Sequence, residues 1–162
     1  MATEIERKFL VTDLSIAKNM ATRIIPITQA YLAVGDDEGL TVRVRITPDR
    51  CLLTIKSISD EDGISRKEWE YELPESDART MMMQKLLGYI EKERCIVPYK
   101  GKQWEVDVFH DEWEGLVLAE IELHDPKEEF DIPPFIGKEV TGDPQYYNSS
   151  LGEEAIAKKK KR

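Results

Sequence analysis

The feature that most constrains the fold of this chain is a regular alternation of charged and apolar residues. In the N-terminal stretch T-E-I-E-R-K-F, the residues Glu4, Glu6 and Lys8 occupy every second position. Successive side chains of a β-strand point to opposite faces, so these three residues share one face of a predicted strand. The same period of two recurs along the chain. It predicts strands at 4–11, 27–34, 40–47, 51–57, 65–73, 89–99, 103–110 and 117–123.

Short turns connect most of these stretches, among them G-D-D-E-G at 35–39 and S-D-E-D-G at 59–63. Many strands joined by short turns are typical of an antiparallel sheet or barrel. We therefore predict a mainly β (α+β) fold, in one domain over residues 1–162, with a few helices packed outside. The length of the chain also favours a single domain.

Caps and helical spacing predict short helices between and after the strands. One helix follows Asp13 as a possible cap. A second is expected from Ser76, as N-cap, to just before Gly88, and a third over 146–157. The basic run Lys158–Arg162 is predicted to be a solvated tail, and its charge also suits the negative end of a helix dipole.

Charge and cysteine content restrict the class of protein. The formal net charge is −9, which argues against a nucleic-acid partner, since that class of protein carries a basic footprint. No apolar run approaches about 18 residues and no signal peptide is recognisable, so no membrane association is expected. Cys51 and Cys95 are far apart, which favours a reducing compartment, and we expect a cytoplasmic location. Whether the protein is a monomer or a homodimer stays open.

The charged faces of the predicted strands are sorted by sign. Arg43 and Arg45 form a purely basic row, whereas Glu120 and Glu122 form a purely acidic one. Like charges side by side repel each other, and an exposed face would normally mix both signs. Two arrangements remain open on this pattern alone. The charges either face solvent around an apolar core, or line a water-filled barrel while the apolar faces pack under the helices.

The charged stretches also resemble a known family. E-I-E-R-K at 4–8 matches the E-x-E-x-K signature of the CYTH superfamily, also called the triphosphate tunnel metalloenzymes. Further pieces follow in that family's order: R-V-R (43–45), T-I-K (54–56), R-K-E-W-E-Y-E (66–72), E-K-E-R (91–94), W-E-V-D (104–107) and A-E-I-E-L (119–123). The resemblance runs from residue 3 to about 151, includes the ending V-T-G-D-P-Q-Y-Y-N-S-S-L, and is to the compact, single-domain bacterial branch.

This resemblance implies an eight-stranded antiparallel β-barrel that binds a triphosphate with divalent metal in its tunnel. Arginine supplies paired donors to phosphate oxygens and lysine a point charge. The expected substrate-binding residues are Lys8, Arg43, Arg45, Lys56, Arg66, Lys92 and Arg94. Carboxylates cannot bind phosphate directly, so the inward acids, Glu105 among them, imply a bridging cation, Mg²⁺ or Mn²⁺. The expected metal ligands are Glu4, Glu6, Glu120 and Glu122, on strands that would be neighbours in a closed barrel.

The implied activity is metal-dependent hydrolysis of a triphosphate, with inorganic tripolyphosphate cleaved to pyrophosphate and phosphate. Phosphoryl transfer depends on positioning and charge neutralisation, so the nucleophile would be water. The candidate catalytic residues are Lys8, Glu68, Glu70 and Asp107, and which carboxylate orients the water stays open. No aromatic or base-reading group stands out among the expected inward positions. Adenylate cyclase, thiamine triphosphatase and non-catalytic polyphosphate binding remain as alternatives.

Overall fold

The structure is a computed structural model, and it describes residues 1–35 and 39–161. The elements are β1 (Ala2–Val11), α1 (Leu14–Met20), β2 (Arg23–Ala33), β3 (Thr41–Ile46), β4 (Cys51–Lys56), β5 (Ser65–Leu73), α2 (Glu75–Met82), β6 (Gly88–Tyr99), β7 (Lys102–Phe109), η1 (Asp111–Trp113), β8 (Val117–Glu122), β9 (Ile136–Glu139), η2 (Pro144–Tyr146) and α3 (Asn148–Lys160). None of the helices in the described part of the chain combines the length and hydrophobicity needed to cross a bilayer.

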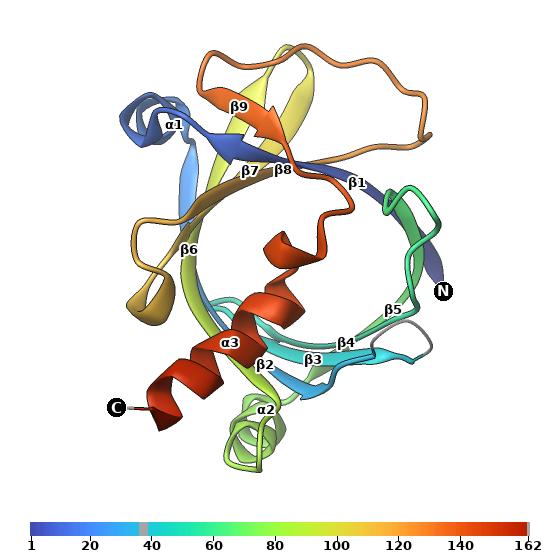
Figure 1. Cartoon of the computed structure of the whole chain (residues 1–162), viewed down its shortest axis with the longest axis vertical. Coiled ribbons are helices and arrows are strands. Elements are labelled where there is room, and N and C mark those ends of the chain that lie inside the picture. Colours follow the sequence, from blue (N-terminus) through green and yellow to red (C-terminus); the bar gives the residue numbers. More distant parts are fainter. Residues whose placement is uncertain (36–38, 162) are drawn as a thin grey trace.

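Strands β1 to β8 close into an antiparallel barrel, as predicted (Figure 1). Around the ring the order is β1-β8-β7-β6-β2-β3-β4-β5, and β5 returns to β1. On one side of β1, Glu6 lies opposite Glu122 of β8. On the other side, Glu4 lies opposite Arg66 of β5. Strands β1 and β8 are therefore neighbours, which the sequence analysis expected.

The sequence analysis does not predict β9. This strand pairs with the second half of β1, where Phe9 lies opposite Glu139, beyond the point at which β5 leaves that edge. Its sequence, I-G-K-E, has no regular alternation. An available edge, rather than the strand's own pattern, therefore gives this segment its conformation.

The apolar faces of the strands point away from the barrel interior and pack under covering segments. Phe9, Trp104 and Ile121 belong to one buried cluster, to which α1 contributes Ala17. Val44 of β3 is buried against α2 in another. Fully burying a large apolar side chain contributes about 1.5–3 kcal/mol, so much of the stabilising core lies outside the barrel. The charged faces point inward, which decides between the two arrangements that the pattern leaves open.

Helix α3 lies across one end of the barrel (Figure 1). At that end the inward positions are apolar, and Phe109 and Leu118 cluster with Leu151 of α3. The sequence analysis expects a few helices packed outside the barrel, and it does not foresee that one of them covers an end. The described part of the basic run, 158–161, is exposed as predicted, and its first residues lie in the last turn of α3, where Nζ of Lys158 is 3.7 Å from the ring centroid of Trp113. Residue 162 lies outside the described residues.

The first two helices show how far local signals determine helix ends. Asp13 caps α1 as predicted, and its side chain accepts a hydrogen bond from the backbone N of Ile16 at 3.1 Å. The prediction for α2 is wrong at both ends. Pro74 precedes the first helical residue in place of Ser76, and the helix ends at Met82, well before Gly88. The helix begins without a side-chain cap, and the acidic first turn of Glu75 and Asp77 complements the helix dipole.

Candidate functional site

The inward faces of the barrel strands enclose a cavity of about 300 Å³. This volume is at the lower end of the range typical of small-ligand sites. Among the predicted site residues, only Asp107 does not line it. The charged lining contains Glu4, Glu6, Lys8, Arg43, Arg45, Lys56, Arg66, Glu68, Glu70, Lys92, Arg94, Glu105, Glu120 and Glu122. The barrel thus brings together residues that are spread over most of the sequence.

An acidic cluster lies where β1 and β8 pair. Glu6 lies opposite Glu122 in the register, and Glu120 lies opposite Lys8. Burial, followed by the charges of Glu120 and Glu4, raises the pKa of Glu6 to about 8. Burial and nearby acids also raise the pKa of Glu122. Among the described residues no cation forms an ion pair with Glu6, so the cluster has more acidic groups than its surroundings neutralise.

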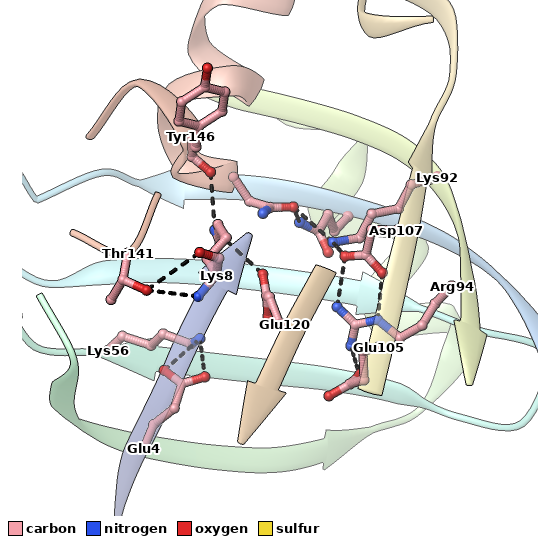
Figure 2. Close-up of polar contacts among 12 residues, drawn as sticks. Glu4, Lys8, Lys56, Lys92, Arg94, Glu105, Asp107, Glu120, Thr141 and Tyr146 are labelled. Carbon is pink, nitrogen blue, oxygen red and sulfur yellow. Dashed lines mark hydrogen bonds and ion pairs between the residues drawn. The ribbon is translucent and has the colours of Figure 1, made fainter. Parts of the chain in front are cut away.

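Two acids of the lining, Glu4 and Glu120, are paired with cations (Figure 2). Carboxylate oxygens of Glu4 accept hydrogen bonds from Nζ of Lys56 at 2.9 Å and from Nε of Arg66 at 3.0 Å. Against the effect of burial, these cations lower the pKa of Glu4 to about 2. Nζ of Lys8 lies 3.4 Å from Oε1 of Glu120 and, also against burial, lowers the pKa of that carboxyl. Both acids are therefore ionised at neutral pH.

Asp107 is buried and does not line the cavity, and it joins two predicted phosphate-binding residues (Figure 2). Its Oδ2 accepts hydrogen bonds from Nζ of Lys92 at 2.7 Å and from Nη2 of Arg94 at 2.9 Å, and its Oδ1 accepts one from Nε of Arg94 at 2.8 Å. Against the effect of burial, Arg94 and Lys92 hold the pKa of Asp107 far below its usual range. Asp107 is 1% exposed, so it is placed to orient these two cations rather than to contact a ligand.

The two arginines of β3 have no carboxylate partner among the described residues. Arg45 donates from Nε and Nη2 to Oε1 of Gln29 at 3.1 and 3.0 Å. Burial, together with the charges of Arg43 and Arg94, lowers the pKa of Arg45 to about 9. Nε of Arg43 is buried without a hydrogen-bond partner. A buried unpaired donor is costly, so these guanidinium groups have free capacity for an anionic ligand.

The acidic cluster has the chemistry of a divalent-cation site. It offers carboxylate oxygens, the hard ligands that Mg²⁺ and Mn²⁺ prefer, and the raised pKa values of Glu6 and Glu122 reflect a deficit of positive charge. Within residues 1–35 and 39–161, no three such side chains converge on one point. Glu4 and Glu120 instead contact their basic partners. In ligand type and in charge the acidic cluster fits a divalent cation, although its carboxylates do not converge within the described residues.

Comparisons with known proteins agree with this geometry. Residues 2–151 match the profile of the CYTH domain. A protein of Acetivibrio thermocellus named inorganic triphosphatase is 44% identical over 160 residues, which cover 93% of this chain and 94% of that protein. A protein of Nitrosomonas europaea with the same name is 33% identical over 156 residues, which cover 92% of this chain and 96% of that protein.

This chain belongs to the CYTH family. A solved structure of an inorganic triphosphatase is similar to it with a TM-score of 0.66 and 29% sequence identity, over 94% of this chain and 96% of that one. The CYTH resemblance seen in the charged motifs is confirmed, and so is the eight-stranded barrel that it implied.

The sequence analysis misses three residues that line this CYTH barrel, Tyr31, Tyr147 and Asn148, and the buried Gln29 that contacts two of them. Nε2 of Gln29, on β2, donates to Oη of Tyr31 and to Oδ1 of Asn148, both at 3.0 Å. Nζ of Lys92 also donates to Asn148, at 2.7 Å. The expected lack of an inward aromatic is wrong, because Tyr31 and Tyr147 line the cavity. Period two along β2 could have placed Gln29 and Tyr31 inside, whereas Asn148 follows an irregular segment that offers no such signal.

The acidic cluster predicts a pH-dependent stability that Glu6→Gln should remove. The raised pKa means that the folded protein holds the Glu6 proton up to about pH 8, whereas an unfolded chain releases it near its ordinary value of 4.5. Folding therefore takes up a proton in this window, and the contribution of Glu6 to the free energy of unfolding falls as pH rises. Gln mimics the protonated acid but cannot ionise. Between about pH 5 and pH 8.5, the free energy of unfolding of the variant should rise by about 1–3 kcal/mol relative to that of the wild type. A pKa shift corresponds to ~1.4 kcal/mol per pKa unit, and water in the cavity screens part of this energy.

Urea denaturation in a chelating buffer at both pH values measures this difference. Glu129→Gln, an exposed acid outside the barrel, is the matched control and should show no such gain. A difference between Glu6→Gln and wild type that stays constant with pH would contradict the assignment of a protonated acid at this position.

Proposed function

We propose that this protein is a metal-dependent triphosphatase that hydrolyses inorganic tripolyphosphate to pyrophosphate and phosphate. One observation carries the proposal: a single cavity holds arginines without carboxylate partners, Arg43 and Arg45, and a Glu6 carboxyl that has no ion-pair partner among the described residues. A triphosphate bound with a divalent cation would satisfy both sets at once. The relatives named inorganic triphosphatase support the same substrate.

Several basic side chains of the lining would bind the triphosphate together. Arg43 and Arg45 would be the principal phosphate ligands, because neither guanidinium is committed to a carboxylate. Arginine suits this task through its planar set of donors. Lys8, Lys56, Arg66, Lys92 and Arg94 would contribute further charge, while each keeps an acidic partner.

We propose that Glu4, Glu6, Glu120 and Glu122 hold Mg²⁺ or Mn²⁺. When bound, the cation would neutralise the acidic cluster and polarise phosphate oxygens. The raised pKa of Glu6 is consistent with this role, since a ligand carboxyl that keeps its proton in the absence of metal gives it up when metal binds.

The remaining acids would orient the attacking water or position the basic side chains of the lining. Glu70 accepts a hydrogen bond from Oγ1 of Thr54 at 3.0 Å, and Oε2 of Glu68 lies 3.4 Å from Nζ of Lys56. Both line the cavity, and we propose that one of them orients the attacking water. Asp107 would position Lys92 and Arg94 instead of acting as a catalytic residue, because its oxygens are occupied and it does not line the cavity.

We also propose a cytoplasmic location for this single-domain protein. The support is that Cys51 and Cys95 are both free and buried, as thiols in a reducing compartment usually are.

The decisive assay is product analysis on a substrate panel with Mg²⁺ and Mn²⁺ in parallel. Tripolyphosphate should yield equal amounts of pyrophosphate and orthophosphate, with the highest kcat/KM of the panel, and chelation should abolish the reaction. ATP and thiamine triphosphate test the two other activities, since Tyr31 and Tyr147 give the cavity aromatic surface. Cyclic AMP as the main product, or binding without turnover of any triphosphate, would contradict the proposal.

Arg43→Ala tests the phosphate-binding role. A charge-assisted hydrogen bond contributes roughly 1.5–3 kcal/mol, so kcat/KM for tripolyphosphate should fall by about ten- to a hundredfold. The free energy of unfolding should change little, because Nε of Arg43 has no partner and its Nη2 loses only a long contact of 3.4 Å with Oγ1 of Thr54. Arg79→Ala, on the exposed surface of α2, is the control and should keep full activity. Unchanged kinetics in Arg43→Ala would remove this residue from the site.

A further inference from the structure

The backbone of β1 has an interval without a strand partner at the position of Lys8. On that edge β5 pairs with β1 only as far as Ile5, and β9 begins to pair at Phe9. In between, the backbone N of Glu6 donates to the carbonyl of Ile64 at 3.1 Å, and at Lys8 the segment after β9 supplies the partners. The backbone N of Val140 donates to the carbonyl of Lys8 at 2.8 Å. The backbone N of Lys8 donates to Oγ1 of Thr141 at 2.9 Å (Figure 2). A side-chain hydroxyl thus replaces a backbone carbonyl in the ladder.

That hydroxyl can serve as the acceptor only if its own proton points elsewhere. A threonine hydroxyl has one proton and two acceptor lone pairs. Oγ1 of Thr141 lies 2.7 Å from Oε2 of Glu139 and 3.4 Å from the carbonyl of Lys8. The shorter contact is to an ionised carboxylate, which is the stronger acceptor. The proton therefore goes to Glu139, and a lone pair remains directed at the Lys8 N–H.

Glu139 is itself fixed from outside the barrel by Arg7, the one charged residue of the E-I-E-R-K stretch that does not line the cavity. Nε of Arg7 donates to Oε2 of Glu139 at 2.8 Å, and the guanidinium carbon lies 5.2 Å from the ring centroid of Phe130. The hydrogen bond from Arg7 lowers the pKa of Glu139, so this carboxylate stays ionised.

The far end of this chain of contacts reaches the cavity. Thr141 and Gly142 line it, and Nζ of Lys8 donates to the carbonyl of Tyr146 at 3.0 Å. Gly142 packs against the turn before β5, where a Cβ on Gly63 would come within 2.4 Å of its Cα. The segment that contains Thr141 is therefore held against both β1 and the β4–β5 turn.

We propose that Thr141, oriented by the Arg7–Glu139 ion pair on the outside of the barrel, is a positioning residue for Lys8. Thr141 and Glu139 act through the backbone of Lys8, which sets the origin of an ammonium group that faces the bound phosphates. The proposal rests on the proposed function for its kinetic consequence, but the orientation of the Lys8 amide stands independently of any activity.

The test compares Thr141→Val, which keeps the shape of threonine without its hydroxyl, with Thr141→Ser, which keeps the hydroxyl. For tripolyphosphate hydrolysis, Thr141→Val should lower kcat by about three- to tenfold, the effect of one ordinary hydrogen bond, with KM within about twofold. Thr141→Ser should restore most of the loss. Glu139→Gln, which keeps side-chain volume, should lower kcat less than Thr141→Val does. The double variant should be no slower than Thr141→Val alone, because both changes break one relay.

Glu75→Gln is the matched control, since Glu75 forms a comparable ion pair with Arg79 on α2 and should leave kcat unchanged. Additive losses in the double variant, or a Ser variant no better than Val, would overturn the positioning role. Hydrogen exchange of the Lys8 amide, measured without substrate, gives an independent readout. It should be faster in Thr141→Val and Glu139→Gln than in wild type and Thr141→Ser. If the wild type fails to hydrolyse tripolyphosphate, the proposed function fails, and equal exchange rates in all variants would separately refute the relay.

Discussion

Burying charged side chains inside a closed barrel is costly unless each charge finds a partner, and this constraint shapes the whole molecule. Some charges are satisfied within the protein, as in the Asp107 contacts with Lys92 and Arg94. Others are not, notably Glu6 on the acidic side and Arg43 on the basic side. The unsatisfied charges of opposite sign share one cavity, so the interior is complementary to an anion that arrives with a cation.

The same constraint explains why the apolar core lies around the barrel. Once one face of every strand is committed to the charged interior, the other face must be covered to stabilise the fold, and α1, α2 and the segment before β9 provide that cover. Helix α3 has a different position, because it seals one end with apolar contacts and brings Asn148 to the cavity wall. Elements that stabilise the barrel thus also complete its lining.

Much of the fold and of the charged lining could be predicted from the sequence, because period two places alternate side chains on one face and the CYTH motifs show which face is inside. Arg43, Lys56 and Glu120 were assigned in this way. Residues outside regular alternation were missed. Thr141 acts from an irregular segment, and β9 forms only because β1 has a free edge. Asp107 was predicted to be catalytic for a different reason. Alternation gives the direction of a side chain but does not show whether the side chain reaches the cavity or is buried beside it.

The central claim is that tripolyphosphate with a divalent cation binds inside the barrel and neutralises both sets of charges. Thermal melting tests it most directly, with Ca²⁺ in place of Mg²⁺ to limit turnover. At a hundredfold excess over Kd, binding to the folded state adds about 2.7 kcal/mol. For a domain of this size that raises Tm by roughly 5–10 °C. Orthophosphate, which spans less of the cavity, and NaCl at matched ionic strength should give much smaller shifts. Equal shifts from all three would contradict binding in the cavity.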